Sequence, residues 1–232
     1  MVNKKIFKIQ KYKIEIEGDP LVFFPSPHGT KGIGENIKVF KSDSVLDIGT
    51  GTGILAILAA KMGGNVYAID ILDDSIKCAK KNALLNGVNI KFVKSDLFKN
   101  INNKKFDVII ANVPQELISP KIIKKLKSEI ITGMDGRDNG SEVLFRTLKN
   151  AKKFMTVKTR FYVAVYSLSG WRNNLRYILE NYNAKLVDFY SGEVKKFVYD
   201  DLDYYKDKKE IGIYLNKRKY WGDIFVFELS LK

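Results

Sequence analysis

Short apolar runs alternate with amphipathic segments through the first half of the chain. Four runs have the length and the Val, Ile and Ala content of buried parallel strands: 44–48, 65–70, 90–93 and 106–111. Helical segments follow the first two runs, at 54–61 and 75–86, and both end at glycines. We expect Asp73 to cap the second of these helices. Strands that alternate with helices in this way predict an α/β fold.

The same periodicities predict further helices and strands in the rest of the chain. Expected helices cover 31–40, 120–127, 141–154 and 170–182, and expected strands cover 159–166, 185–190 and 223–230. Residues 191–222, between the last two strands, hold several Tyr and a Trp among acids and lysines. Long segments of this kind are usually functional, so we interpret 191–222 as a substrate lid or partner surface, or as an excursion that packs its own aromatics.

The N-terminal residues alternate apolar and polar positions with a period of two, as half-buried strands do. The alternation covers 5–17, a turn follows at 18–20, and 21–24 is expected to form a second short strand. The chain therefore divides into an N-terminal β cap, residues 1–28, and an α/β domain, residues 29–232.

Three glycines at alternate positions, Gly49, Gly51 and Gly53, join the first buried strand to the first helix. Glycine has no Cβ, so the backbone of such a turn can approach a ligand closely. Asp47 precedes the turn at the carboxyl end of the strand, where ligands of open α/β sheets bind. Dinucleotide-binding turns have the spacing G-x-G-x-x-G, whereas the third glycine here comes one residue early. The turn is either a different ligand site or a bare tight turn.

Two more acids follow the next two strands. Asp70 ends the second strand, 17 residues after Gly53, where a carboxylate can accept both ribose hydroxyls of a bound nucleoside. Asp96 comes just after the third strand. Together with the glycine turn, the two acids predict a nucleoside site at the carboxyl edge of the sheet.

The stretch 45–57 resembles motif I of the Rossmann-like S-adenosylmethionine (SAM) methyltransferases, D-x-G-x-G-x-G, and the resemblance extends over roughly residues 20–166. It implies SAM as cofactor and a mostly parallel, seven-stranded sheet with an antiparallel last strand. It also implies a set of cofactor contacts at matching positions. These are Asp47, Gly49, Gly51 and Gly53 for the methionine end, Asp70 for the ribose and Asp96 for the adenine. Thr50, Ile71, Leu97 and Asn112 are the further candidate cofactor contacts.

The fourth strand delivers Asn112-Val-Pro-Gln115 to the same edge. Release-factor glutamine methyltransferases and adenine-amino DNA methyltransferases carry N-P-P-Y there, and the chain is similar to them at Asn112 and Pro114. In those families the Asn oxygen and a backbone carbonyl accept hydrogen bonds from a planar amino group, on which the aromatic stacks. Val113 and Gln115 depart from the pattern, so that stacking wall is missing, although a Gln can hydrogen-bond a polar acceptor. Asn112, Pro114 and Gln115 are the candidate catalytic residues.

Other segments bear on the acceptor. Residues 22–25 and 132–137 resemble the proline-bearing entry strand and the G-x-D-G segment of the release-factor branch; Asp135, Arg137 and Asp138 there are either site residues or a solvated turn. The x-P-Q variant also resembles plant methionine S-methyltransferases, whose acceptor is a thioether. A thioether or carboxylate acceptor needs no general base, whereas a hydroxyl or ammonium does. His28, the only histidine, is either a substrate contact or a loop residue.

Composition narrows the class of partner. The net charge of +14 suggests nucleic acid, but 34 of the 40 basic residues are Lys, and specific nucleic-acid surfaces favour Arg, so Lys-rich composition explains the charge equally well. No apolar run is long enough to cross a membrane, no signal peptide is apparent, and Cys78 is the only cysteine. We therefore expect a cytoplasmic protein with no membrane or DNA partner, and we leave a homo-oligomer open.

The sequence thus predicts a SAM-dependent methyltransferase with no metal. Its expected acceptor is a protein side-chain amide or a small polar metabolite held at Asn112–Gln115. An RNA or tRNA methyltransferase is the alternative among enzymes. A non-catalytic subunit of the same fold, binding a partner through 191–222, is the alternative of another class.

Overall fold

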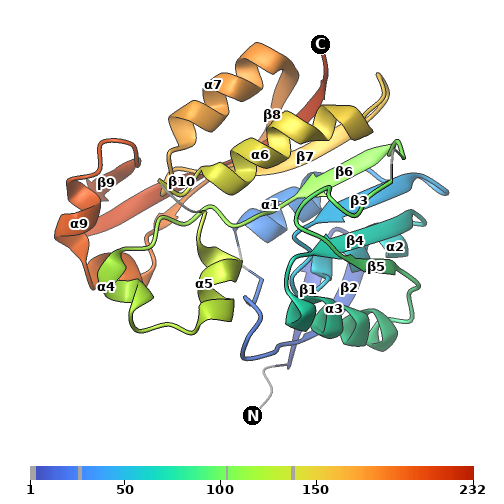
Figure 1. The fold of residues 1–232 in the computed structure, drawn as a ribbon, viewed down its shortest axis with the longest axis horizontal. Coiled ribbons are helices and arrows are strands. Elements are labelled where there is room, and N and C mark those ends of the chain that lie inside the picture. Colours follow the sequence, from blue (N-terminus) through green and yellow to red (C-terminus); the bar gives the residue numbers. More distant parts are fainter. Residues whose placement is uncertain (1–3, 26–27, 103, 137–138) are drawn as a thin grey trace.

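A mostly parallel sheet forms the centre of the molecule (Figure 1). The computed structural model describes residues 4–25, 28–102, 104–136 and 139–232. Seven strands run side by side in the order β5-β4-β3-β6-β7-β10-β8, and β9 pairs with the free part of β10. The first five are mutually parallel, and β10 is antiparallel to both its neighbours, as predicted. The strands are β3 (Ser44–Ile48), β4 (Asn65–Asp70), β5 (Lys91–Lys94), β6 (Val108–Ala111), β7 (Arg160–Tyr166), β8 (Tyr182–Glu193), β9 (Ile213–Asn216) and β10 (Lys219–Leu231).

Helices cover both faces of the sheet (Figure 1). One face packs against α1 (Gly29–Asn36), α2 (Ile54–Lys61) and α3 (Asp73–Leu85). The other packs against α6 (Glu142–Ala151), its 3₁₀ extension Lys152–Phe154, and α7 (Trp171–Asn181). The short helices α4 (Pro120–Ile123), α5 (Ser128–Met134), α8 (Lys196–Tyr199) and α9 (Leu202–Lys206) lie beyond the carboxyl edge.

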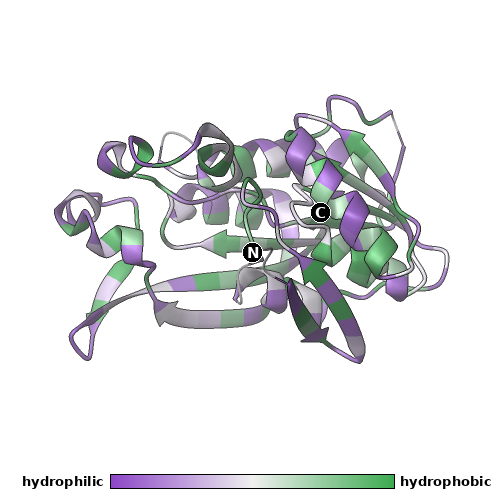
Figure 2. Ribbon diagram, turned by 90° about the horizontal axis from the view of Figure 1, so that it is seen from below, coloured by the Kyte–Doolittle hydropathy of each residue, from purple (hydrophilic) through white to green (hydrophobic). Residues whose placement is uncertain are grey.

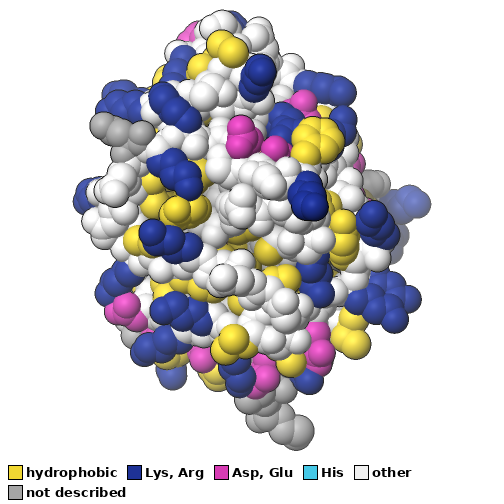
Figure 3. All heavy atoms as spheres, turned by 90° about the vertical axis from the view of Figure 1, so that its right-hand side faces the viewer, with side chains coloured by type: hydrophobic (Ala, Val, Ile, Leu, Met, Phe, Trp, Pro, Cys, Tyr) yellow, Lys and Arg dark blue, Asp and Glu magenta, His cyan; other side chains and the backbone are white. Residues whose placement is uncertain are grey.

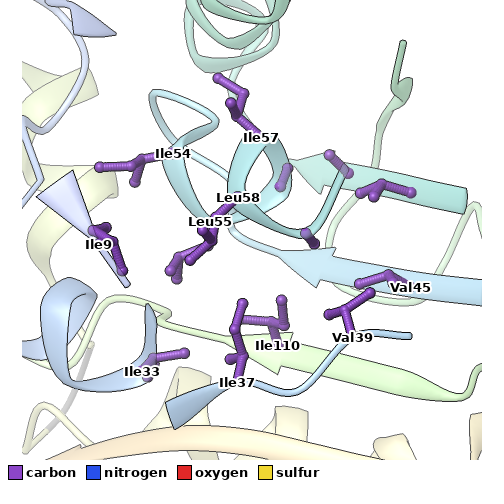
Figure 4. Close-up of a cluster of buried hydrophobic side chains, with 14 of the residues drawn as sticks. Ile9, Ile33, Ile37, Val39, Val45, Ile54, Leu55, Ile57, Leu58 and Ile110 are labelled. Carbon is purple, nitrogen blue, oxygen red and sulfur yellow. The ribbon is translucent and has the colours of Figure 1, made fainter. Parts of the chain in front are cut away.

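Successive residues of the central strands belong to two separate hydrophobic cores. Val45 and Ile110 face the α1–α2 side, where they meet Ile33, Ile37 and the leucines of α2 (Figure 4). Their neighbours Leu46 and Ile109 face α6 and α7. Because both faces are covered, the short strands read as continuous apolar runs, whereas the long outer strands mix hydrophobic and hydrophilic residues (Figure 2).

The N-terminal cap is a two-stranded hairpin, β1 (Lys4–Ile9) and β2 (Tyr12–Glu17). Both strands come from the single alternating stretch 5–17, which reverses at Gln10 in a left-handed conformation (φ 51°). The predicted strand at 21–24 was wrong: these residues form a turn and an extended loop without strand pairing. Short apolar runs do not distinguish a strand from a loop whose side chains pack on a core.

Two asparagines fix the cap to α3. The side-chain amides of Asn82 and Asn86 each accept a hydrogen bond from a β2 backbone N–H and donate one to a β2 carbonyl, at Glu17 and Glu15 respectively, with distances of 2.7–3.1 Å. These side chains therefore satisfy the outer edge of β2, which would otherwise present unpaired backbone groups.

The structure corrects two helix predictions and gives the secondary structure of residues 191–222. Asp73 does not cap α3, because the N-cap is Leu72, and Asp73 lies in the first turn and pairs with Lys94. The predicted helix 120–127 stops at Ile123. Residues 191–222 are not a long loop: they extend β8, form α8 and α9, and return through the β9–β10 hairpin. Within the described part of the chain, no helix is long and apolar enough to cross a membrane.

Candidate functional site

A cleft of about 260 Å³ opens at the carboxyl ends of β3, β4 and β6. Its lining comes from the glycine turn after β3, the residues after β4 and β5, the segment 112–116 after β6, and helix α5. This is the edge at which the sequence placed the site, and all but one of the predicted site residues line the cleft.

The glycine turn exposes backbone to the cleft. Gly49 and Gly51 have φ angles of +69° and +53°, a left-handed conformation that glycine adopts without strain. The N–H groups of Gly49 and Thr50 both donate to Ile69 O at 2.9 Å, which ties the turn to the end of β4. A Cβ on Gly51 would meet no protein atom within 4 Å, so the turn leaves room for a ligand there.

Gly53 is the exception, since it does not line the cleft. It is the N-cap of α2, with φ +86°, and a Cβ there would lie 3.0 Å from the Cβ of Ala79 on α3. The third glycine therefore allows α2 and α3 to pack closely, which is a different role from the predicted ligand contact.

Asp47 and Asp70 are buried at the base of the cleft. Thr50 Oγ1 donates to Asp47 Oδ2 at 2.7 Å, while the N–H groups of Gly51 and Leu72 donate to the two oxygens of Asp70 at 2.9 and 3.0 Å. Burial raises the pKa of Asp47 to about 7; the bond from Thr50 opposes this rise and the charge of Asp70 adds to it. Burial also raises the pKa of Asp70. A cationic ligand would stabilise both carboxylates in their charged form.

Asp96 lies at one end of the cleft and is paired with two cations. Lys99 Nζ lies 2.7 Å from Oδ2, and Arg146 of α6 contacts both carboxylate oxygens at 3.2 and 3.3 Å. These partners hold the pKa of Asp96 below its usual range, so it remains a hydrogen-bond acceptor. Leu97 beside it has a strained φ of +49°, and Ile71 is exposed at the cleft. Arg146 was not predicted, because the contact joins residues 50 positions apart.

Asn112 is held by side chains on both sides. Its Nδ2 donates to Thr30 Oγ1 at 3.1 Å, and Tyr166 OH donates to its Oδ1 at 3.1 Å. These bonds fix which way the amide points. A carbonyl oxygen has two lone pairs, so Oδ1 keeps one for a further donor. Tyr166 ends β7, the parallel neighbour of β6, and the rule that led to Asn112 could have identified it as well.

Gln115 lines the cleft, but its polar atoms bind the protein itself. Nε2 donates to Ala164 O at 2.7 Å and to Val113 O at 3.4 Å, and Tyr166 N donates to Oε1 at 3.2 Å. The side chain thus continues the β6–β7 ladder beyond the end of β6. The expectation that Gln115 hydrogen-bonds an acceptor finds no support here, whereas Pro114 stays half-buried in the wall of the cleft.

At the far end of the cleft, the structure brings together Glu116, which the sequence did not single out, and residues from two segments that it did, 22–25 and 191–222. Glu116 is buried and pairs with Lys195, which comes from the 191–222 segment, and Phe23 lies beside them. Asp135 lines the cleft, while Arg137 and Asp138 lie outside the described residues. His28 does not line it and lies near the ring of Tyr190.

The described residues hold no group of three or more His, Cys, Asp or Glu side chains arranged for a metal ion. Cys78 is buried on α3, and burial raises the pKa of its thiol to about 11, so it is protonated at neutral pH. The chemistry available in the cleft therefore comes from its carboxylates, from Asn112 and Lys195, and from the exposed backbone of the glycine turn.

Comparison with known proteins gives similarities in sequence. A family model for ribosomal protein L11 methyltransferases matches residues 34–137. A protein of Methanocaldococcus jannaschii, named provisionally as a protein N5-glutamine methyltransferase, is 34% identical over 167 residues, which are 70% of this chain and 83% of that protein. The ribosomal protein L11 methyltransferase of Caldicellulosiruptor bescii is 42% identical over 120 residues; the chain spans 39% of its length.

Solved structures share the fold. A methyltransferase from Pyrococcus furiosus superposes with a TM-score of 0.57 over 93% of this chain and 88% of that one, at 18% identity. At that identity the likeness concerns the arrangement of strands and helices.

Proposed function

The chain belongs to the Rossmann-like SAM-dependent methyltransferases, and from that premise we propose that its methyl acceptor is the side-chain amide nitrogen of a protein glutamine. The observation that carries the proposal is the fixed amide of Asn112 at the cleft. The similarity to a protein named as an N5-glutamine methyltransferase supports it.

In this proposal the buried acids and the open turn hold the cofactor. SAM supplies a methyl group on a positively charged sulfur. The turn 49–51 and Asp47 would receive its methionine end, and the buried charge of Asp47 and Asp70 favours a cationic ligand. Asp70 would accept from the ribose hydroxyls, and Asp96, kept ionised by Lys99 and Arg146, would accept from the adenine amino group.

The chain positions the acceptor instead of activating it with a strong base. Asn112 Oδ1 accepts one N–H of the planar amide, which turns the nitrogen toward the methyl group. Thr30 and Tyr166 prevent the Asn amide from rotating, so this geometry is in place before the acceptor arrives.

Labelled methyl transfer tests the proposal. Purified enzyme is incubated with methyl-labelled SAM and the protein fraction of its own cells, and labelled peptides are sequenced by mass spectrometry. We expect one added methyl on a glutamine side chain, and on the order of 100-fold slower transfer for Asn112→Ala. Asn183→Ala, on β8 away from the cleft, is the control. Label on another residue type, or only on small metabolites, would contradict the glutamine acceptor.

RNA methylation is a second candidate, favoured by the net charge of +14. On the face of the molecule that carries β4, β5 and α3, Lys and Arg are spread out with acids among them (Figure 3). The same assay with the RNA fraction distinguishes the two. Label in RNA that declines steeply between 50 and 200 mM salt would favour the RNA acceptor.

A further inference from the structure

Three separate parts of the chain meet at the far end of the cleft. Glu116 follows the 112–115 turn, Lys195 follows β8, and Phe23 precedes α1. Lys195 Nζ pairs with Glu116 Oε1 and lies 4.6 Å from the centre of the Phe23 ring. The Glu116 side chain is only 10% exposed, whereas that of Lys195 is 38% exposed. We call Glu116, Lys195 and Phe23 the acceptor-end cluster.

One oxygen of this cluster has no partner. Glu116 Oε2 is buried and makes no hydrogen bond to any described residue. A buried acceptor without a donor costs stability, and a charged one costs more. The backbone of Glu116 does not relieve this, because its N–H donates to Met134 O and its carbonyl accepts from Gly136 N. Since the residue lines the cleft, the missing donor is expected to come from a ligand.

We propose that Glu116 and Lys195 recognise the primary carboxamide of the methyl acceptor, an inference that rests on the proposed function. A carboxamide has N–H donors and a carbonyl acceptor in one plane. Glu116 Oε2 accepts one N–H, leaving the other for Asn112 Oδ1, and Lys195 Nζ donates to the carbonyl. The acceptor-end cluster would thus bind both the N–H and the carbonyl of the acceptor amide. These contacts would take the place of the stacking aromatic that is missing at Gln115.

The cluster also sets specificity between amide and acid. A glutamate side chain would place an oxygen, not an N–H, against Glu116 Oε2, and like charges would repel. Glu116→Gln reverses this arrangement. If the new amide keeps its oxygen on Lys195, its NH₂ takes the place of Oε2 and opposes the acceptor's own N–H. Specificity for the amide therefore depends on an acceptor oxygen, and not an NH₂ group, at the position of Glu116 Oε2.

Binding of two small probes tests the inference. Enzyme loaded with S-adenosylhomocysteine is titrated calorimetrically with N-acetylglutamine N-methylamide and with N-acetylglutamate α-N-methylamide, of which only the glutamine probe carries a primary carboxamide. Wild type should prefer the glutamine probe by at least tenfold, and Glu116→Gln should lose about tenfold of that preference. Lys195→Met should weaken the glutamine probe, whereas Lys196→Met, an exposed neighbour outside the cleft, should not. Unchanged affinity for S-adenosylhomocysteine shows that each variant is folded.

The outcomes separate this inference from the function on which it rests. If wild type binds the glutamine probe and Glu116→Gln binds it equally well, the cluster does not read the amide and the proposed function stands. If wild type binds S-adenosylhomocysteine but neither probe up to 50 mM, the amide acceptor is contradicted and the cluster with it. Equal affinity of wild type for both probes also overturns the inference.

Discussion

Two buried carboxylates lie at the base of the cleft, and their charged forms need stabilising partners there. Asp47 and Asp70 are each less than a tenth exposed, and burial raises the pKa of both. Their hydrogen bonds come from Thr50 Oγ1 and from backbone N–H groups. A cationic ligand would stabilise the charged forms of both carboxylates. Ligand affinity and the stability of the ligand-free protein therefore depend on the same two charges.

Asp47 predicts how the stability of the ligand-free protein depends on pH. Its pKa is 3.8 in an unfolded chain and about 7 in the fold, so between these values the folded state binds more protons. Stability contributed by Asp47 is therefore lost as pH rises from 4 to 7. Asp47→Asn should remove this loss and raise the free energy of unfolding at pH 8 by up to about 4 kcal/mol, measured by urea denaturation. A variant no more stable than wild type at pH 8 would contradict the buried charge.

Loss of the Gln115 side-chain amide should destabilise the fold. Gln115→Leu removes the hydrogen bonds that the Gln115 side chain makes to Ala164 O and Tyr166 N at the end of β7, so the free energy of unfolding should fall by about 2–4 kcal/mol. Denaturation in urea measures it. A loss below 0.5 kcal/mol would mean that Gln115 does not brace β6 against β7.

The sequence identified the residues of the cleft better than their partners. Asp47, Asp70, Asp96 and Asn112 could be located because each lies at or just after the carboxyl end of a strand, and these ends reach a common edge. Gln115 was located correctly but misinterpreted, because its partners lie on a strand about 50 residues later. Side-chain partners across a sheet leave no local pattern.

The glycine turn also matters for the packing of helices. Gly53 allows α2 to pack closely on α3, whereas Gly49 and Gly51 line the cleft. Gly53→Ala adds a Cβ 3.0 Å from Ala79 at φ +86°, so strain and crowding should together cost about 2–4 kcal/mol. Gly87→Ala is the matched control, with φ +64° and no atom within 4 Å, and should cost about 1 kcal/mol. Thermal unfolding of both variants compares them. Equal losses would contradict the packing role of Gly53.

The attachment of the N-terminal hairpin depends on helix α3. Asn82→Ala removes the hydrogen bonds to Glu17 and to Thr52 O, and Asn86→Ala removes those to Glu15. Hydrogen exchange of the β2 amides should accelerate in both variants, since the strand edge loses its partners. Unchanged protection at residues 15 and 17 would show that apolar packing alone holds the hairpin.

Several buried elements were predicted closely, whereas β6 begins at Val108, two residues after its expected start at 106. β3, β4 and α2 match their expected bounds, because each is a short apolar run with glycine at one or both ends. The loop at 21–24 and the short helix α4 were misjudged, because tertiary contacts decide such segments.

At the scale of the whole molecule, residues 191–222 are part of the fold and of the cleft. Val198, Tyr205 and Ile211 form a third core with Leu117, and Lys195 reaches Glu116. The segment therefore packs its own aromatics, as one of the two interpretations has it, and Lys195 also lines the cleft. Nothing in its composition indicated which lysine faces inward.

We propose that the cleft at the carboxyl ends of β3, β4 and β6 binds SAM through its glycine turn and acids. Melting curves with SAM, S-adenosylhomocysteine and NAD test it most directly, in wild type and in Asp70→Asn. We expect both sulfur nucleosides, at about 100 times their Kd, to stabilise wild type by about 2.7 kcal/mol, and NAD to have no effect. Asp70→Asn should abolish most of this stabilisation. A folded wild-type sample that neither SAM nor S-adenosylhomocysteine stabilises would contradict SAM binding at this cleft.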